Sequence, residues 1–400
     1  MLTKSKSHLL FIDGIRALAA LYVTIHHEVL QYYKIPTIYG FHFIKKNLLK
    51  FFLAGHYAVA LFIVVSGFSL MISVTRHNHT LKDGALDFFK RRCIRILPPY
   101  YCAMLLSLLL IWTIIGHPTG FNWDNSLPVT GFDIVMHLLL LHDFLRPGAW
   151  HINHVFWSIS VEWRIYFFFP LLVILWRRFG ALTTVIFSVG LSLLGLGFLL
   201  VLSNYTPNVN FLEGVHPFII LFALGMLAAD LSLSDKPRAV FVAARYRALP
   251  VWQRLALLLA LLALAVYTGR MDGHEMLMMP VSDISAGLLF ALILFALALE
   301  KSPRVSIAKR MVAWKPLVFV GTFSYSLYLI HAPLLQCLTQ YVLAPLGRSV
   351  DVNMALLALV GTPLVIGAAY GFFYFFEKPF IQMNQRAKKI KLAVITDPAP

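Results

Sequence analysis

Residues 11–31 form an apolar stretch that also carries charged and titratable side chains. The stretch reads FIDGIRALAALYVTIHHEVLQ and is long enough to cross a bilayer as a helix. Its ionisable residues lie near both ends: Asp13, Arg16, His26, His27 and Glu28. Ionisable side chains inside a membrane span are costly and by default indicate function. We therefore expect other helices to surround this stretch and a functional site to lie along it.

Arg16 and His27 share one face of this predicted helix. They are eleven positions apart in the sequence, which at about 100° per residue is close to three full turns. Their separation along the helix axis is roughly 16 Å. The spacing predicts that Arg16 lies near one membrane surface and His27 in the middle or the far half of the membrane.

The composition places the chain among polytopic membrane proteins. Its 400 residues are 59% hydrophobic and 13% charged, with a mean hydropathy of +0.76. The net charge of +16 would suit a nucleic-acid partner, but most lysines and arginines lie between apolar runs, which indicates topology instead. The three cysteines match neither a disulfide framework nor a zinc site. The first apolar run is expected to stay as a helix, because no small-residue cleavage site follows it.

The apolar runs predict an all-α fold with about ten membrane-spanning helices. The predicted spans are 11–31, 51–74, 97–116, 157–176, 181–202, 214–230, 254–269, 281–299, 317–341 and 354–376. A further apolar run, 132–145, is too short to cross and is predicted to be a re-entrant or interfacial helix. We expect residues 1–380 to form one transmembrane domain and residues 381–400 a polar cytoplasmic tail.

Loop charges predict that both termini face the cytoplasm. Basic residues concentrate in alternate loops, as the positive-inside rule requires. The first outer loop is the exception, with Lys34, Lys45, Lys46 and Lys50. These lysines have no topological explanation, and attraction of an anionic substrate is one hypothesis for them.

The segment FFKRRCIRILPPYY, residues 88–101, gathers Arg91, Arg92 and Arg95 at a predicted helix start. An isolated basic cluster at this place is most simply a membrane anchor. The sharper hypothesis is a phosphate clamp, because guanidinium groups match phosphate oxygens. Ser66 and Gly67 in the second span fit close helix packing or close approach of a ligand.

Other polar residues in the predicted spans leave two readings open. Glu162 and Arg164 form either a snorkelling pair at the outer surface or, for Glu162, a carboxylate that orients or deprotonates a partner such as His27. Tyr328 and His331 lie in the ninth span, where a lone histidine is more often structural than catalytic. Residues 117–156 hold several histidines without metal-ligand spacing, so no metal is predicted.

Taken together, these stretches resemble acyltransferase family 3, membrane proteins that O-acylate bacterial cell-surface sugars and related molecules. The opening FIDGIRALAALYVTIHH resembles the family's LDGLRGLA segment and its motif of an arginine, ten residues and a histidine, here Arg16 and His27. Further similarities are SGF at 66–68, FFKRRCIRILPPYY at 88–101, WSISVE at 157–162, SYSLYLIHAP at 324–333 and EKP at 377–379. Ala17 stands where the family usually has glycine, and His26 precedes the motif histidine, although the spacing favours His27.

The resemblance implies transfer of an acyl group from acyl-coenzyme A, with acetyl expected, to a hydroxyl of an extracytoplasmic or membrane-embedded acceptor. The expected acceptor is a cell-surface polysaccharide or lipopolysaccharide sugar, and the expected place is the bacterial inner membrane. No tightly bound cofactor is expected. The predicted roles are catalysis by His27 and Glu162, donor binding by Arg16, Ser66, Gly67, Arg91, Arg92 and Arg95, and support from Asp13, His26, Tyr328 and His331. The alternative is a multi-helix carrier or flippase for an amphipathic substrate. The oligomeric state stays open.

Overall fold

The computed structural model describes residues 9–33, 42–145, 148–206, 209, 215–268, 275–300 and 305–384. Helices make up the described elements, apart from an isolated bridge between Leu145 and Val209. The predicted all-α polytopic fold is confirmed. Residues 385–400, most of the predicted tail, lie outside the described residues.

Each of the ten predicted spans coincides with a helix or a pair of helices. In chain order the main ones are α2 (Leu10–Tyr32), α5 (Gly55–Thr75), α6 (Gly84–Leu110), α8 (Trp157–Phe179), α9 (Ala181–Ser203), α10 (Val215–Leu233), α12 (Val251–Thr268), α13 (Glu275–Leu299), α16 (Ser324–Leu338) and α18 (Thr362–Phe372). Among the described residues, eight helices are long and apolar enough to cross a membrane. Counting a pair bent by 86°, Phe218–Leu233 with Pro237–Ala248, as one span raises the number to nine, against the ten predicted; α2, with its charged residues, is not among them.

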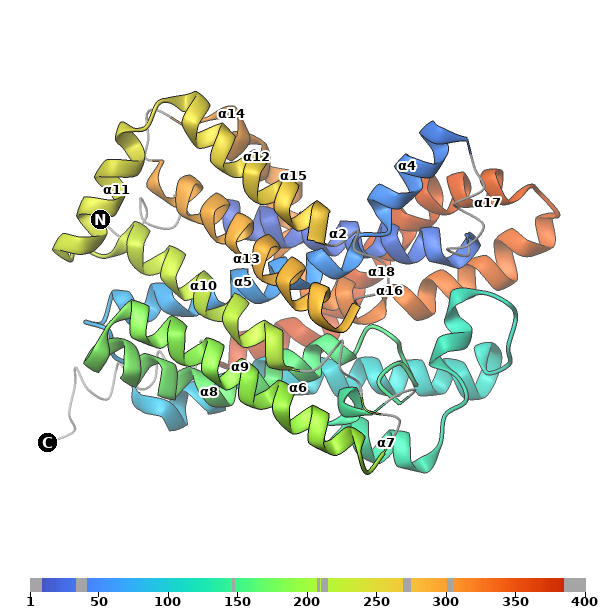
Figure 1. Ribbon diagram of the computed structural model, residues 1–400. Helices are drawn as coiled ribbons and strands as arrows, with labels where there is room; N and C mark the ends of the chain where they lie inside the picture. The colour runs from blue at the N-terminus through green and yellow to red at the C-terminus, as the bar shows by residue number, and fades with distance from the viewer. Residues whose placement is uncertain are drawn as a thin grey trace, which may run out of the picture.

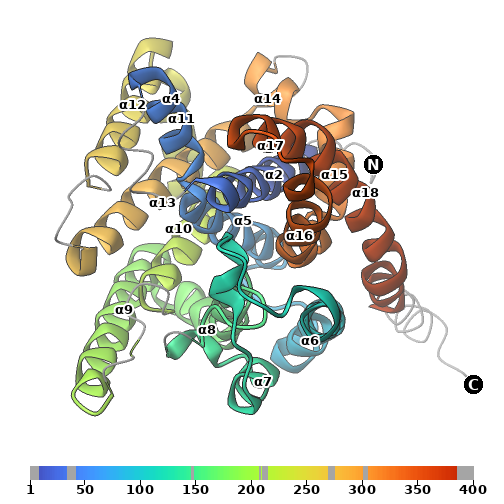
Figure 2. The ribbon, with the colours of Figure 1, turned by 90° about the vertical axis from the view of Figure 1, so that its right-hand side faces the viewer.

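Helix α2 lies inside the bundle rather than at its edge. It packs against α5, α15 (Lys315–Thr322) and α16, and the end-on view places it among them (Figure 2). A neighbouring helix also satisfies part of its buried polar surface, since Thr362 of α18 donates a hydrogen bond to one oxygen of the buried Glu28 carboxylate. Enclosure therefore explains how this span tolerates charge that a lipid-facing helix could not.

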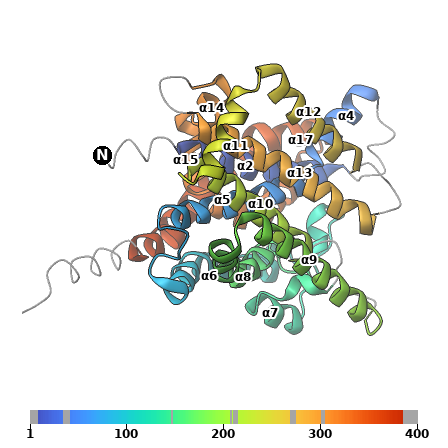
Figure 3. The ribbon, with the colours of Figure 1, turned by 60° about the vertical axis from the view of Figure 1, so that its left-hand side comes forward.

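Two helices at the periphery have the opposite character. α9 exposes Leu193, Leu194 and Phe198, and α12 exposes Leu255 and Leu259. α9 lies beside α8, and α12 packs on α13, so each contacts the bundle along one side (Figure 3). Exposed apolar side chains on such helices suit contact with lipid.

The short helices lie at the two ends of the bundle. α11 (Pro237–Ala248) and α14 (Ile307–Val312) lie at one end, while α4 (Phe43–Phe52), α7 (Gly131–Leu138) and α17 (Val350–Leu356) lie at the other (Figure 1). α7, followed by a single 3-10 turn at His142–Phe144, is the short helix predicted within 132–145. Its eight residues are too few to cross a bilayer, as expected.

Two boundaries differ from the predicted ones. α6 begins at Gly84, about two turns before the arginine cluster, and runs through Pro98 and Pro99. Neighbouring helices make such prolines tolerable in membranes. Tyr325 of α16 joins this part of α6 to the bundle by donating a hydrogen bond to the Ile96 carbonyl at 3.0 Å. The single span predicted at 317–341 is instead broken at Phe323 into α15 and α16.

Candidate active site

Helix α2 brings its two motif residues to two neighbouring cavities. Arg16 lines one cavity and His27 lines the other. The predicted common face is therefore confirmed, because both side chains leave the same side of α2 at different depths. We call the two spaces the arginine cavity and the histidine cavity.

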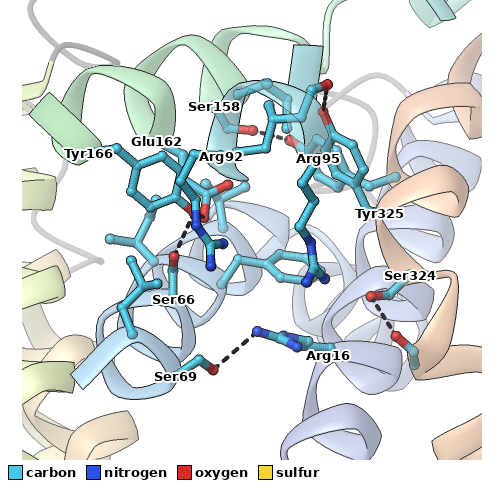
Figure 4. A pocket seen from close by; sticks show the side chains of 18 of the residues that line it. Arg16, Ser66, Ser69, Arg92, Arg95, Ser158, Glu162, Tyr166, Ser324 and Tyr325 are labelled. Carbon is cyan, nitrogen blue, oxygen red and sulfur yellow. Dashed lines mark hydrogen bonds between the residues drawn. The ribbon is translucent and has the colours of Figure 1, made fainter. Parts of the chain in front are cut away.

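The arginine cavity has a volume of about 320 Å³ and gathers charged side chains from several helices. Its charged and hydroxyl-bearing lining residues include Arg16, Ser66, Ser69, Arg92, Arg95, Glu162, Tyr166 and Glu377. The guanidinium groups of Arg16, Arg92 and Arg95 point into the cavity from α2 and α6 (Figure 4). Three guanidinium groups against two carboxyl groups make this a site suited to an anion.

Hydrogen bonds hold the walls of the arginine cavity. Arg16 donates to Ser69 Oγ at 3.0 Å and lies 3.5 Å from Asp13. Ser66 donates to the Tyr166 hydroxyl at 2.9 Å, and that hydroxyl in turn donates to Glu162.

Within the described part of the chain, the buried Nε of Arg92 has no hydrogen-bond partner. The guanidinium of Arg92 instead lies 5.6 Å from the centre of the Tyr166 ring. A bound anion would satisfy this cation better than the aromatic ring does.

The histidine cavity has a volume of about 280 Å³ and is lined by neutral polar and aromatic groups. Its lining residues include His26, His27, His56, Asn122, Asn125, Trp150, His154, Trp157 and Tyr328. The His27 ring lies in a cluster of imidazoles, with ring centres 4.9 Å from His26, 4.7 Å from His154 and 5.2 Å from His331.

His27 and His154 are in contact through their ring nitrogens. His27 Nδ1 lies 3.2 Å from His154 Nε2, and Asn122 Nδ2 lies 3.3 Å from the same nitrogen. When His27 donates from Nδ1 to His154, its lone pair is on Nε2, the form required of a base or a nucleophile. Burial, with smaller contributions from nearby histidines, lowers the pKa of His154 to about 3, so His154 is neutral.

A shared wall separates the two cavities. Val59 and Tyr328 line both of them. The Tyr328 hydroxyl lies 2.6 Å from Ser158 Oγ and donates to the Val155 carbonyl at 3.0 Å. A group that passes from one cavity to the other must therefore pass this wall.

Comparison with known proteins identifies this arrangement. The family model for the acyltransferase domain matches residues 9–374, which is most of the chain and includes both cavity-lining ends of α2. The chain belongs to the acyltransferase domain family. The family resemblance and the acyltransferase class predicted from the sequence are confirmed, and the carrier hypothesis loses its basis.

Named relatives fit this family. The peptidoglycan O-acetyltransferase OatA of Listeria monocytogenes is 23% identical over 353 residues, 84% of this chain and 50% of the relative. The O-acetyltransferase OatA of Staphylococcus aureus is 24% identical over 374 residues, 90% of this chain and 56% of the relative. The acyltransferase MdmB of Streptomyces mycarofaciens is 29% identical over 164 residues, 40% of this chain and 38% of the relative. This acyltransferase chain thus spans about half the length of the OatA relatives, and no solved structure matches it.

Glu162 lies in a different place from the one its predicted role required. We expected this carboxylate to orient His27, but the structure puts it in the arginine cavity, bonded to Tyr166. The ring of His27 is hydrogen-bonded to His154 instead. The difference arises because α8 runs from Trp157, at the histidine cavity, to Glu162 more than one turn further along the helix.

Arg91 and Gly67 also lie apart from the cavity they were predicted to line. Arg91 lies 3.5 Å from Asp83 and donates to the Lys82 carbonyl, because one residue step turns it about 100° from Arg92. At Gly67, an added Cβ would lie 2.1 Å from the Phe222 carbonyl oxygen, so this glycine serves close packing of α5 on α10.

The remaining predicted residues support the histidine cavity or its wall. His26 Nδ1 lies 3.1 Å from the Phe52 carbonyl, and its ring packs on Gly55, where a Cβ would come within 2.3 Å. His331 is fully buried, and its Nδ1 lies 2.8 Å from the Tyr328 carbonyl. Among the described residues, no group of three or more histidine, cysteine, aspartate or glutamate side chains is placed to hold a metal ion.

His56, His154 and Asp283 were not among the site residues predicted from the sequence. His56 lines the histidine cavity and bonds to Asp283, 227 positions away in the chain. His154 was noted only among the histidines that do not form a metal pattern. No local spacing reveals these partners, because each lies on a different segment from the group it contacts.

Proposed function

We propose that the chain transfers an acyl group, acetyl, from acyl-coenzyme A on the cytoplasmic side to a hydroxyl of a glycan on the opposite side of the membrane. The observation that carries this proposal is that one helix, α2, places Arg16 and His27 in two adjacent cavities of different chemistry. Such an arrangement suits a donor and an acceptor that approach from opposite sides and meet at a shared wall.

The donor end of the proposal rests on the arginine cavity. Arginine pairs with phosphate through two parallel hydrogen bonds, and coenzyme A carries several phosphates. Arg16, Arg92 and Arg95 would hold these phosphates, and Ser66 would line the path of the pantetheine arm. The arm would carry the thioester past Tyr328 and Val59 into the histidine cavity.

The acceptor end rests on the histidine cavity. Side chains of Asn122 and Asn125 offer hydrogen bonds, and Trp150 offers an aromatic face, which together suit a sugar. His27 would take the proton of the acceptor hydroxyl at Nε2, or accept the acyl group briefly. General-base catalysis of this kind typically contributes about 10²–10⁴-fold in rate.

The expected location is the bacterial inner membrane, with both termini in the cytoplasm. The basic ends of the helices support this orientation, since Arg177 and Arg178 end α8 on the arginine-cavity side of that helix. The relatives named O-acetyltransferases favour an acetyl group, and the one named for peptidoglycan favours a glycan acceptor. Peptidoglycan strands and lipopolysaccharide are therefore the first acceptors to test.

Proteoliposomes with one defined orientation test the proposal. The cytoplasmic face of the protein points into the vesicle, where radiolabelled acetyl-coenzyme A is enclosed. Glycan strands or lipopolysaccharide are added outside, to the other face. We expect label on the outer acceptor and free thiol inside. If the acceptor is labelled only when donor and acceptor share a compartment, transfer across the membrane is contradicted. If no acceptor leads to thiol release, the acyl-coenzyme A donor is contradicted.

A further inference from the structure

A histidine and a carboxylate form a buried pair at the edge of the histidine cavity. His56 of α5 lines the cavity, and its Nε2 lies 2.8 Å from Oδ1 of Asp283 on α13. Asp283 is 1% exposed, and in the described part of the chain its second oxygen has no hydrogen-bond partner. The His56 ring lies parallel to the Trp157 ring, with 9° between the planes and 6.1 Å between the centres.

His27 has poor surroundings for a positive charge. Three other imidazole rings lie within 5.2 Å of it, and the one hydrogen-bonded to it, His154, is neutral. A buried charge without an opposite charge is expensive. The acceptor's proton can therefore pass through His27, but no acidic group among the described residues that contact this ring stabilises a proton that stays there.

His56 has the surroundings that His27 lacks. A carboxylate at hydrogen-bond distance favours the charged form of an imidazole. The groups around His56 include Asp283 from α13, His26 from α2, Trp157 from α8, Phe218 from α10 and Tyr57 from α5 itself. Asp283 is the acidic group among these neighbours, and the aromatic rings pack around the pair.

We propose that His56, paired with Asp283, holds the proton that the acceptor hydroxyl gives up during acyl transfer. This inference rests on the proposed function. The hydroxyl oxygen bonds to the thioester carbonyl carbon, the carbon–sulfur bond breaks, and its electron pair leaves with sulfur as the coenzyme A thiolate. The hydroxyl proton is taken up by His27, crosses the histidine cavity that both rings line, and rests on His56 as an imidazolium paired with Asp283. It then returns to the thiolate or to water, which restores the neutral ring.

A second buried histidine–aspartate pair, near the end of α5, offers a matched control for a purely structural role. His79, just after the end of α5, places Nε2 2.6 Å from Oδ1 of Asp230 on α10, and both residues are buried. Trp176 donates to the other oxygen of Asp230 at 3.2 Å. Neither residue of this pair is among those that line the two cavities. A tether between helices should behave alike in both pairs, whereas a proton-holding role belongs to His56 alone.

The test compares His56→Gln and Asp283→Asn with His79→Gln and Asp230→Asn in proteoliposomes. The probes are acetyl-coenzyme A with peptidoglycan strands or lipopolysaccharide, whichever the wild type acetylates better. We expect His56→Gln to lower kcat by about 10²-fold or more while the KM for acetyl-coenzyme A is unchanged. The His79 and Asp230 variants should keep kcat within a few-fold of wild type after correction for folded protein.

A pH profile separates the proton-holding role from a tether. The base must be neutral to accept a proton, so wild-type kcat should fall on the acid side. Removing the carboxylate destabilises the imidazolium, so Asp283→Asn should shift this acid limb to lower pH by about 1–3 units and reduce the plateau. Asp230→Asn should leave the limb in place. This profile keeps the proposal testable even if His56→Gln does not fold.

The outcomes are distinguishable. Equal losses in His56→Gln and His79→Gln, or an unmoved acid limb in Asp283→Asn, would overturn the inference while the proposed function stands. Absence of thiol release by wild type would overturn the proposed function itself, and this inference with it.

Discussion

The two cavities beside α2 differ in the kind of polar group that they contain. The arginine cavity holds permanently charged guanidinium groups with two carboxyl groups among them. The histidine cavity holds imidazoles, which can take up and release a proton, with amides and tryptophans around them. Fixed charge binds an anion, and titratable groups move protons. The difference between the two cavities supports the proposal that one helix serves binding at one end and chemistry at the other.

Only a thin wall keeps these two environments apart. Val59 and Tyr328 are common to both linings, so the separation is one side-chain layer thick. A donor held by its phosphates can then present its thioester to the second cavity without leaving the first. Variants in each cavity and in the wall should break this division of labour in different ways.

The largest effect is expected from His27→Ala. Removing the imidazole deletes the proposed base from the histidine cavity, so kcat should fall by about 10²–10⁴-fold or below detection. Thiol release from acetyl-coenzyme A in proteoliposomes measures this. A variant that keeps more than a tenth of wild-type kcat would remove His27 from the chemistry.

The next effect concerns the donor. Arg92→Ala and Arg95→Ala should each raise the KM for acetyl-coenzyme A by about 10–100-fold, because each removes a charge-assisted bond of about 1.5–3 kcal/mol. Arg91→Ala is the matched control, since Arg91 contacts Asp83 and the Lys82 carbonyl instead. An equal change in the KM for acetyl-coenzyme A in all three variants would indicate that this arginine cluster is a membrane anchor and not a donor site.

A smaller effect is expected from Glu162→Gln. In its observed position this carboxylate opposes a bound phosphate, so its neutralisation should tighten donor binding by about 1 kcal/mol, or roughly fivefold. The acid limb of the rate profile should not move, because Glu162 does not contact His27. A displaced limb would place Glu162 back in the proton chemistry, as the sequence suggested.

The smallest effect is expected from Tyr328→Phe in the wall. The change removes the hydroxyl that bonds to Ser158 and to the Val155 carbonyl, at a cost of about 1 kcal/mol in stability. Thermal inactivation should show this loss, with kcat lowered less than tenfold. A complete loss of turnover in a folded variant would mean that the hydroxyl takes part in transfer.

The helical fold and the common face of α2 could be predicted from the sequence for clear physical reasons. Apolar runs of membrane length predict helices because lipid leaves the backbone few alternatives, so all ten predicted spans coincide with helices. The common face of Arg16 and His27 follows from the helical repeat alone. Residue spacing predicts which side chains share a face only within a single helix.

The sequence could not predict which helices meet. Glu162 faces arginines instead of His27 because the depth of α8 against α2 is set by packing. His56 and Asp283 each look like isolated polar residues in apolar runs, and their pairing depends on contact between α5 and α13. Arg91 and Arg92 look equivalent in the sequence until the position of α6 decides which of them faces inward.

The most direct test of the account is the dissociation constant of a non-hydrolysable acetyl-coenzyme A analogue for His27→Ala. Because the proposed site for the donor's charged end, at Arg16, lies about 16 Å away along α2, we predict a value within about twofold of wild type in a variant without turnover. A loss of affinity as large as that of Arg92→Ala would contradict the account, because binding and chemistry would then share one site.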